Sequence, residues 1–353
     1  MKYERDHEKR HYSDKIGMKA AVCQEPFNLR MVDRATPERS EGEVLVRIKR
    51  VGLCGTDYHI FAGRHPFLAY PRVIGHELSG EVAAADPGSR FREGQLVAIN
   101  PYLSCGTCIA CRKGKPNACV NIRVLGVHTD GGMCELLSVP ESALVDATGL
   151  TPDQAAMLEF LSVGAHAVAR SELQSGERVL VVGAGPIGIG TALFARLQGA
   201  KVTLVDRREA RLTYARGHLG FDRVVTAGDD VHHVLASLTE GEMFDTVFEA
   251  TGSLESMGQS LAYVAAGGTL VFVGVAPGEI VFSDPEFHKR ETTLIASRNA
   301  LAEDFERVMA AMKTGLVPTA ALHSHSFAAE ETPTRLPELI AHADHVLKAI
   351  AYF

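Results

Sequence analysis

The sequence predicts an α/β fold in which a doubly wound parallel sheet is joined to a smaller, β-rich domain. Residues 176–275 alternate apolar, strand-sized runs with helical stretches, as a parallel sheet covered by helices on both faces requires. Residues 18–147 hold short alternating runs broken by glycine and proline, which is typical of a β-rich unit. The 353 residues also exceed the roughly 250–300 at which single hydrophobic cores stop growing, so two domains are expected.

The composition excludes several classes of protein. Hydrophobic residues make up 46% and charged residues 22%, and the longest apolar runs fall well short of the ~20 residues of a membrane span. The net charge of −7 provides no electrostatic footprint for nucleic acid or an anionic membrane. The polar segment Met1–Gly17 lacks the apolar stretch of a secretory signal, and we expect it to be a disordered extension of a cytoplasmic protein.

Several segments of the β-rich part show their secondary structure in their sequence. Met18–Cys23 is the first apolar run, and Glu43–Val51 alternates apolar and polar residues as a half-buried strand does. His76–Ala85 and Gln95–Ile99 follow a similar pattern. The character changes at Thr151, where an N-cap threonine, a proline at the first helical position and an acid behind it predict the start of a helix.

The second half of the chain predicts the parallel sheet and the helices between its strands. The expected strands are Arg178–Val182, Lys201–Val205, Arg223–Val225, Asp245–Glu249 and Thr269–Val273. Helices are expected at Ile187–Gln198 and at Ala302–Lys313, and beyond the second of these the chain returns to the first domain. The sheet is therefore expected to lie between two parts of the β-rich domain.

The first strand of the sheet runs into the glycine motif Gly183-Ala-Gly185-Pro186-Ile187-Gly188, which opens a helix. Strand, turn and helix in this order are typical of a Rossmann dinucleotide site, whereas the glycines alone could form an ordinary turn. Gly183 permits the tight turn, Gly185 lets the backbone approach the pyrophosphate, and Gly188 allows close packing of helix on sheet. We therefore expect the cofactor phosphates at the N-terminus of this helix.

An acid at the end of the next strand indicates which dinucleotide binds. Asp206 follows Gly188 by 18 residues, a spacing that fits the carboxylate that binds the adenosine ribose. That carboxylate accepts hydrogen bonds from both ribose hydroxyls and repels a 2′-phosphate, so NAD is predicted in preference to NADP. Arg207 and Arg208 keep NADP open as an alternative, because a neighbouring arginine can accommodate the phosphate.

Four of the seven cysteines crowd into one short segment, and they are Cys105, Cys108, Cys111 and Cys119. In a chain without a secretion signal this crowding indicates metal binding and not disulfides. Four thiolates suit a closed, structural zinc site, with an iron–sulfur cluster as the alternative.

Residues that lie farther apart indicate a second, open metal site. Cys54 lies in a turn-rich segment after a strand, His76 and Glu77 come further along the same domain, and Glu159 lies near the domain junction. One cysteine, one histidine and one carboxylate would leave a fourth zinc position for water or substrate. Each residue alone is also consistent with a structural role, as a buried thiol, a satisfied histidine or a solvated acid.

Taken together, the motifs resemble the zinc-containing medium-chain alcohol dehydrogenase family from Met18 onward. The matching segments, in family order, are Gly52-Leu-Cys54-Gly-Thr56-Asp57, Gly75-His76-Glu77-Leu-Ser-Gly80, the four-cysteine segment and the glycine motif. Leu158-Glu159-Phe-Leu-Ser-Val-Gly164 and Val124-Leu-Gly-Val-His128 are similar to the branch of sorbitol dehydrogenases and L-galactonate 5-dehydrogenases. The resemblance implies a GroES-like catalytic domain, residues 18–160 and 300–353, and a Rossmann NAD-binding domain, residues 161–299.

The resemblance also implies roles for individual residues of the catalytic zinc site. Cys54 and His76 would be ligands of the metal. Glu77 matches the acid that ligates or closely supports the metal in this family, and Glu159 matches a carboxylate that stands near it, directly or through water.

Further roles concern proton transfer, the cofactor and the substrate. Thr56 and His59 match the hydroxyl and the imidazole of a proton relay. Arg211 matches a contact to the cofactor ribose or adenine. Arg298 falls where the family projects a residue into the cleft, where it could pair with a carboxylate or hydrogen-bond to a polyol.

The function implied by the resemblance is hydride transfer from a secondary alcohol of a polyol or sugar acid to NAD, with two zinc ions per chain. An L-threonine 3-dehydrogenase-like activity, or that of another zinc alcohol dehydrogenase, is the alternative, since Cys54-Gly-Thr-Asp-Tyr-His59 suits it as well. A non-catalytic regulatory or structural relative is a remote alternative, which the presence of every ligand and relay residue disfavours. The expected partners are a small-molecule substrate and further copies of the chain in a dimer or tetramer.

Overall fold

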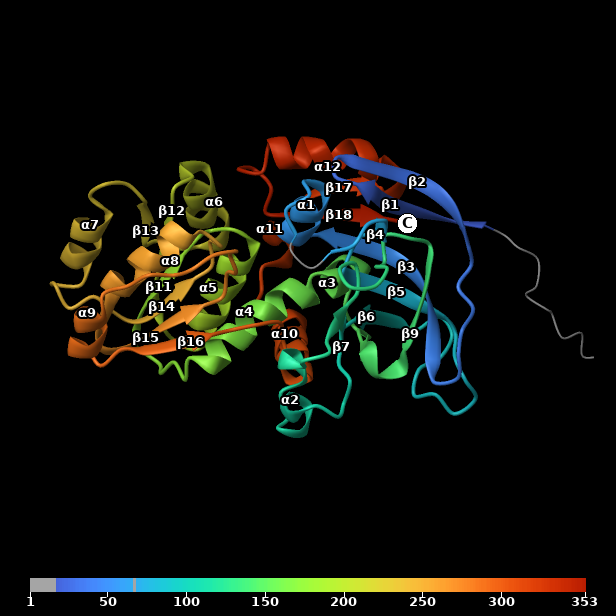
Figure 1. The fold of residues 1–353 in the computed structure, drawn as a ribbon, viewed down its shortest axis with the longest axis horizontal. Helices are drawn as coiled ribbons and strands as arrows, with labels where there is room; N and C mark the ends of the chain where they lie inside the picture. Colours follow the sequence, from blue (N-terminus) through green and yellow to red (C-terminus); the bar gives the residue numbers. More distant parts are fainter. Residues whose placement is uncertain (1–16, 66–67) are drawn as a thin grey trace, which may run out of the picture.

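The computed structural model describes residues 17–65 and 68–353, which form two lobes (Figure 1). One lobe is built on a parallel sheet and the other on a larger mixed sheet, so the predicted α/β fold class is confirmed. The predicted N-terminal extension lies outside the described residues up to position 16, and Gly17 already belongs to the first strand. No helix among the described residues has the length and apolar character needed to cross a bilayer.

The parallel sheet has the strand order β13-β12-β11-β14-β15-β16, and each neighbouring pair is parallel. Its strands are β11 (Arg178–Val182), β12 (Lys201–Asp206), β13 (Val224–Thr226), β14 (Phe244–Glu249), β15 (Val264–Phe272) and β16 (Thr293–Ala296). The order reverses between β11 and β14, where a doubly wound sheet opens a ligand crevice at its carboxyl edge. β16 has no counterpart among the predicted strands, and unlike the buried inner strands of the sheet it is largely exposed.

Helices cover both faces of this sheet (Figure 1). They are α5 (Pro186–Leu197), α6 (Glu209–Leu219), α7 (Val231–Leu238), α8 (Leu254–Ser260) and α9 (Asp284–Lys289). In α5 every residue from Gly188 to Ala195 is buried, because this helix packs against the sheet on one side and against α4 (Leu158–Arg170) on the other. The predicted helix at this position is confirmed, and it begins one residue earlier, at Pro186.

The mixed sheet has the order β10-β6-β5-β3-β18-β17, and β9 also pairs with β3. Its strands are β3 (Glu43–Leu53), β5 (Glu77–Ala84), β6 (Leu96–Ile99), β9 (Leu136–Pro140), β10 (Leu144–Asp146), β17 (His323–Ala328) and β18 (Lys348–Tyr352). The alternation predicted for β3 is confirmed, since Val44, Val46 and Ile48 are buried whereas Arg47 is exposed. This half-buried pattern is what a strand with one face on the core requires.

Two smaller sheets and several short helices complete the second lobe. The small sheets contain β1 (Gly17–Glu25), β2 (Asn28–Ala35) and β4 (Arg72–Val73), and β7 (Tyr102–Leu103) with β8 (Arg123–Val124). The helices of this lobe and of the junction are α1 (Gly55–Phe61), α2 (Ile109–Arg112), α3 (Pro152–Ala156), α10 (Ala302–Lys313), α11 (Thr319–Leu322) and α12 (Thr332–Ala341).

The helix α4 lies at the junction of the two lobes (Figure 1). It packs against α5 of the parallel-sheet lobe and against α10, and it also contacts β5. The domain boundary predicted at residue 160 therefore falls inside a helix that serves both lobes. Immediately before it, Thr151 caps α3 by accepting a hydrogen bond from Gln154 N, which confirms the predicted helix start.

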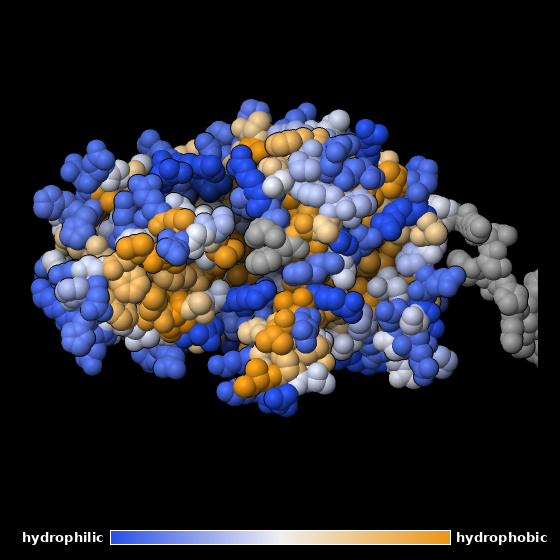
Figure 2. All heavy atoms as spheres, viewed as in Figure 1, coloured by the Kyte–Doolittle hydropathy of each residue, from blue (hydrophilic) through white to orange (hydrophobic). Residues whose placement is uncertain are grey.

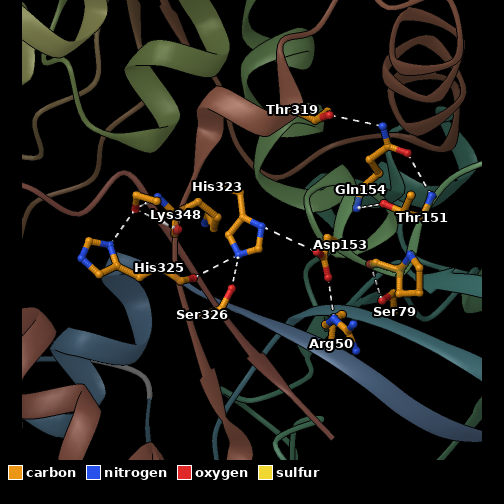
Figure 3. Close-up of polar contacts among 12 residues, drawn as sticks. Arg50, Ser79, Thr151, Asp153, Gln154, Thr319, His323, His325, Ser326 and Lys348 are labelled. Carbon is orange, nitrogen blue, oxygen red and sulfur yellow. Dashed lines mark hydrogen bonds and ion pairs between the residues drawn. The ribbon is translucent and has the colours of Figure 1, made fainter. Parts of the chain in front are cut away.

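A polar network fastens the C-terminal part of the chain to the first domain (Figure 3). The carboxylate of Asp153 in α3 pairs with Arg50 of β3 and, at 3.6 Å, with His323 Nδ1 of β17. Gln154 Nε2 donates to Thr319 Oγ1 at 3.2 Å. Residues beyond α10 thus rejoin the first lobe, as the sequence predicts.

Candidate active site

The glycine motif forms the turn between β11 and α5, and two of its glycines are sterically required. Gly183 has φ = +103°, in the left-handed region that side chains rarely adopt. A Cβ on Gly188 would lie 1.7 Å from the carbonyl oxygen of Gly183, so a side chain is excluded. Gly185 is the N-cap of α5, Pro186 occupies its first turn, and Ile187 follows half-buried. The free backbone N–H groups of this turn suit phosphate.

Asp206 lies at the end of β12 beside this turn, with its carboxylate held by the backbone. Its Oδ2 accepts from Ala184 N at 2.7 Å and its Oδ1 from Arg208 N at 2.8 Å. Arg211 Nη1 lies 3.9 Å from Asp206 Oδ2. Together with Gly183 and Gly185, these side chains line a cavity of about 730 Å³. The structure therefore brings the predicted cofactor residues together.

The four clustered cysteines converge without forming a disulfide. Sγ–Sγ distances are 3.5 Å for Cys108–Cys111, 3.8 Å for Cys108–Cys119 and 3.5 Å for Cys105–Cys119. A zinc–sulfur tetrahedron with arms of about 2.3 Å has edges of about 3.8 Å, so the spacing fits the predicted metal. Hydrogen bonds from the backbone N–H groups of Thr107 and Cys108 lower the pKa of the Cys105 thiol to about 5, which favours the thiolate that a metal binds.

The residues of the predicted open site also meet. The possible ligand atoms of Cys54, His76 and Glu77 all lie within 4.8 Å of one another. Cys54 follows β3, His76 precedes β5, and these two strands pair antiparallel with Gly52 opposite Glu77. A Cβ on Gly52 would lie 2.2 Å from Glu77 Oε2, so glycine at this position makes room for the acid.

Asp57 supports this cluster, although no role was predicted for it. Its carboxylate is fully buried and accepts from Cys54 N at 2.9 Å and from Gly75 N at 3.1 Å. Its Oδ1 lies 3.8 Å from Nδ1 of His76, a buried nitrogen that has no hydrogen-bond partner. An acid behind a histidine is the usual support of a metal ligand, and because Nδ1 faces this acid, the other ring nitrogen, Nε2, is the one left to bind a metal.

A buried ion pair binds Glu77 from the opposite end of the chain. Lys348 Nζ lies 2.6 Å from each carboxylate oxygen of Glu77 and 3.2 Å from the carbonyl oxygen of Leu53. Both side chains are fully buried, and the ammonium lies 4.2 Å from the centroid of the Phe160 ring. The sequence offers no signal for this pair, because a lysine near the C-terminus is most often a surface residue.

Glu159 is also buried, but it does not belong to the cluster of Cys54, His76 and Glu77. Its Oε1 accepts a hydrogen bond from the hydroxyl of Tyr102, a residue for which the sequence predicts no role. Burial raises the pKa of Glu159, and the negative charge of Glu77 also raises it, while the charge of His76, the hydrogen bond from Tyr102 and the charge of Lys348 lower it. The negative charge of the Glu159 carboxylate is therefore only partly balanced by its neighbours.

The predicted relay residues lie on α1, directly after Cys54, and the predicted substrate residue lies on the segment after β16. Thr56 Oγ1 lies 3.9 Å from Cys54 Sγ. His59 is exposed in the last turn of α1, where partial burial and the charge of Arg64 lower its pKa. Arg298 is exposed in the segment after β16, and its carbonyl oxygen accepts from Asn117 Nδ2 at 2.9 Å.

The pKa values of two further histidines are affected by charges that extend from Arg298 to His76. Burial lowers the pKa of His128, and the positive charge of Arg298 lowers it further. Burial likewise lowers the pKa of His65, with added effects from His128, His59 and His76. These groups are therefore close enough to share one electrostatic environment. A dinucleotide crevice and a Cys–His metal cluster in one chain define a metal-dependent dehydrogenase.

Comparison with known proteins agrees with this class. Residues 40–149 match the alcohol dehydrogenase GroES-like domain, and residues 186–314 match the zinc-binding dehydrogenase family. The chain is 41% identical to L-galactonate-5-dehydrogenase of Escherichia coli, over 88% of this chain and 92% of that protein. It belongs to the zinc-containing medium-chain alcohol dehydrogenase family and is an oxidoreductase of that family.

Other relatives differ in the activity for which they are named. The chain is 35% identical to D-altritol 5-dehydrogenase of Agrobacterium fabrum, over 80% of this chain and 84% of that protein. It is also 35% identical to an L-threonine 3-dehydrogenase of Rhizobium etli, over 74% and 77% respectively.

Solved structures with the same fold hold both kinds of dinucleotide. An alcohol dehydrogenase, RspB, from E. coli in complex with NADH has a TM-score of 0.90 and 28% identity, over 96% of this chain and 99% of that one. A zinc-binding dehydrogenase from Sinorhizobium meliloti bound to NADP has a TM-score of 0.87 and 29% identity, over the same shares.

Proposed function

We propose that this protein oxidises a secondary alcohol of a polyol or sugar acid and transfers the hydride to NAD. The observation that carries the proposal is the cluster of Cys54, His76 and Glu77, whose possible ligand atoms all lie within 4.8 Å of one another. Cys54 and His76 would provide two ligands of a catalytic zinc, and zinc bound there would lower the pKa of an alcohol hydroxyl. The four cysteines would hold a second, structural zinc.

We assign the third ligand of the catalytic zinc to Glu159 and a supporting role to Glu77. Withdrawing Glu77 from Lys348 would leave a buried ammonium unpaired, which costs about 3–5 kcal/mol. Glu159 would give up a single hydrogen bond from Tyr102, which costs about 1–3 kcal/mol. Because Glu159 is also the less compensated carboxylate, it is the one that a cation would attract.

The relay residues stand where they can move the proton of the alcohol outward. Thr56 lies next to Cys54, and its hydroxyl can accept and donate a proton in turn. His59 follows at the exposed end of the same helix, where an imidazole can exchange the proton with solvent near neutral pH. Asp206 and the glycine turn orient NAD, which supplies the hydride acceptor.

The positive charge of Arg298 favours a sugar acid over an uncharged polyol. Together with burial, this charge lowers the pKa of His128, which keeps that imidazole neutral and leaves the guanidinium as the cationic group. A guanidinium forms strong, charge-assisted hydrogen bonds with a carboxylate. The similarity to a dehydrogenase named for L-galactonate supports the same substrate class, while relatives named for L-threonine keep that amino acid as the second candidate.

The substrate proposal is tested by comparing NADH formation from hexonates, the corresponding hexitols and L-threonine. We expect the hexonates to give the highest kcat/KM. Arg298→Ala should lower kcat/KM about tenfold or more for a hexonate and less for a hexitol, because it removes a hydrogen bond to a charged group. Arg335→Ala, on the exposed face of α12, is the matched control. Equal losses on both substrates, or highest activity with L-threonine, would reject a carboxylate site at Arg298.

The zinc proposal has its own test. Cys54→Ala should abolish turnover and reduce the zinc content from two ions to one per chain, while NADH binding measured by calorimetry changes little. Retained turnover would contradict a catalytic zinc at Cys54. A single zinc in the unaltered protein would instead favour a non-catalytic relative.

We also propose that the protein is cytoplasmic and forms a dimer or tetramer. Figure 2 shows hydrophobic surface on the parallel-sheet lobe and on the four-cysteine segment. On the first, Val275 and Val281 are 87% and 79% exposed, and Leu294 lies on β16, the edge strand of the sheet. On the second, Ile109 and Val120 are 57% and 69% exposed. An exposed edge strand with apolar neighbours suits pairing with another copy of the chain.

A further inference from the structure

Three arginines line the cofactor crevice beside Asp206. Arg207, Arg208 and Arg211 all border the cavity that contains this acid and the glycine turn. A guanidinium in this region is what accommodates the 2′-phosphate of NADP, whereas the acid favours NAD. The contacts that each arginine already makes therefore determine how much positive charge is available to the cofactor.

Arg208 is held both through its backbone and through its side chain. Its N–H donates to Asp206 Oδ1 at 2.8 Å, and its Nε lies 2.8 Å from Asp344 Oδ1. Asp344 belongs to the turn between α12 and β18, which reaches toward the lobe that carries α6 (Figure 1). The ion pair therefore connects the edge of the cofactor crevice to the other lobe.

The same turn also binds Arg211, but in a different way. Arg211 Nη2 donates to the carbonyl oxygen of Ala343 at 3.0 Å, while its Nη1 lies 3.9 Å from Asp206 Oδ2. The charge of Arg211 is thus balanced within the dinucleotide site, whereas the carboxylate that balances Arg208 comes from a segment more than a hundred residues later in the chain.

We propose that Asp344 is a specificity-determining residue, which disfavours NADP by holding Arg208 away from the 2′-phosphate. The proposal rests on the dinucleotide use proposed above. NAD carries a hydroxyl where NADP carries a phosphate of about −2 charge, so NAD loses nothing when Arg208 is bound elsewhere. NADP would meet the carboxylate of Asp206 and would find one of the three guanidiniums, that of Arg208, already paired.

The expected size of the effect follows from the exposure of the pair. The side chains of Arg208 and Asp344 are 40% and 54% exposed, so solvent screens their attraction. A half-exposed ion pair is worth a factor of about five in an equilibrium constant. Removing Asp344 should therefore shift NADPH affinity by this factor without abolishing NADH binding.

The test measures dissociation constants of NADH and NADPH by isothermal titration calorimetry on the intact protein. Calorimetry suits this chain because it contains no tryptophan to report binding by fluorescence. Asp344→Asn should tighten NADPH binding about fivefold and change NADH binding less than twofold. Glu338→Gln removes an exposed acid of α12 that pairs with Arg335, so it is the matched control and should alter neither constant.

A second variant distinguishes the role of Arg208 from a general charge effect. In the background of Arg208→Gln, the gain from Asp344→Asn should disappear. A gain that persists there, an equal change for both dinucleotides, or no change at all would overturn the proposal. Thermal melting of each variant identifies loss of folding. If neither dinucleotide binds the unaltered protein, the proposed dehydrogenase function fails before the role of Asp344 is in question.

Discussion

At the scale of single residues, charge inside the site is balanced by side chains from distant parts of the chain. Lys348 of the last strand neutralises Glu77, and Tyr102 donates to Glu159. Asp57 binds the backbone on both sides of the cluster, at Cys54 and at Gly75. These residues do not act on substrate in our proposal, but they determine which acid is available to a metal.

Replacing Lys348 should show how much its ion pair with Glu77 contributes to the free energy of unfolding. Lys348→Met keeps the volume but leaves the carboxylate of Glu77 buried without a partner, which should lower the free energy of unfolding by about 3–5 kcal/mol. Adding Glu77→Gln removes the unpaired charge and should recover most of the loss. Urea denaturation of both variants checks this, with Lys49→Met, at a half-exposed lysine of β3 that pairs with Glu81, as control. Equal destabilisation of the single and double variants would contradict a charge effect.

The pH dependence of activity should report His59. Burial lowers its pKa below the ordinary value of 6.5, and Arg64 adds to the effect. Because its pKa is lowered, the imidazole stays neutral down to a lower pH and can still accept a proton there. The acidic limb of kcat/KM should therefore lie below pH 6.5 in the unaltered protein and move to higher pH in Arg64→Gln. A limb that stays in place in both Arg64→Gln and His59→Gln would show that another group titrates.

At the scale of elements, the four-cysteine segment also contacts the residues that follow β16. Asn117, which lies between its last two cysteines, donates to the carbonyl oxygen of Arg298 and accepts from Asn299 Nδ2 at 2.9 Å. The same amide contacts His166 Nε2 at 3.1 Å, and His166 Nδ1 lies 2.7 Å from Asp304 of α10. The segment is thus anchored to the backbone that carries the proposed substrate arginine.

Loss of the structural metal should therefore affect substrate binding as well as stability. Cys111→Ser should remove one zinc per chain, lower the melting temperature by roughly 5 °C or more, and raise KM for the alcohol more than it lowers kcat. Metal analysis, thermal melting and steady-state kinetics check the three effects. Ile109→Ser, an exposed change in the same segment, should retain both zinc ions. Unchanged zinc content in Cys111→Ser would contradict the assignment.

At the scale of the whole molecule, the site exists because two lobes are held side by side. α4 packs against both, and the turn at Ala343 and Asp344 carries the second lobe to the edge of the cofactor crevice. Part of the exposed hydrophobic surface lies on the edge strand β16 and its neighbours. This arrangement leaves the edge strand available to another copy of the chain.

The oligomer should depend on that edge. Leu294→Lys places a charge on β16 and should shift the protein from a dimer or tetramer toward smaller species, because a buried charge opposes strand pairing between copies. Light scattering coupled to size-exclusion chromatography measures the change. The exposed Leu316, on the loop after α10, offers Leu316→Lys as control. The same mass for Leu294→Lys and the unaltered protein would place the interface elsewhere.

Much of the architecture is contained in local patterns. The alternation in Glu43–Val51, the threonine cap at Thr151 and the glycine motif each predict an element that the structure confirms. The candidate metal and cofactor residues could also be recognised in the sequence, because thiols, imidazoles and glycines at particular spacings have few other uses. The edge strand β16 was not recognised, since its residues are largely exposed and it lacks the pattern of a buried strand.

The sequence by itself determined the fold class, the glycine turn and the residue types that can bind zinc, because these depend on spacing along the chain. Tertiary structure alone decided which charges meet. Lys348 reaches Glu77, Tyr102 reaches Glu159 and Asp344 reaches Arg208 through packing of segments far apart in sequence. Electrostatic energy depends on the distance between charges and on their burial, and neither quantity can be read from the order of residues in the sequence.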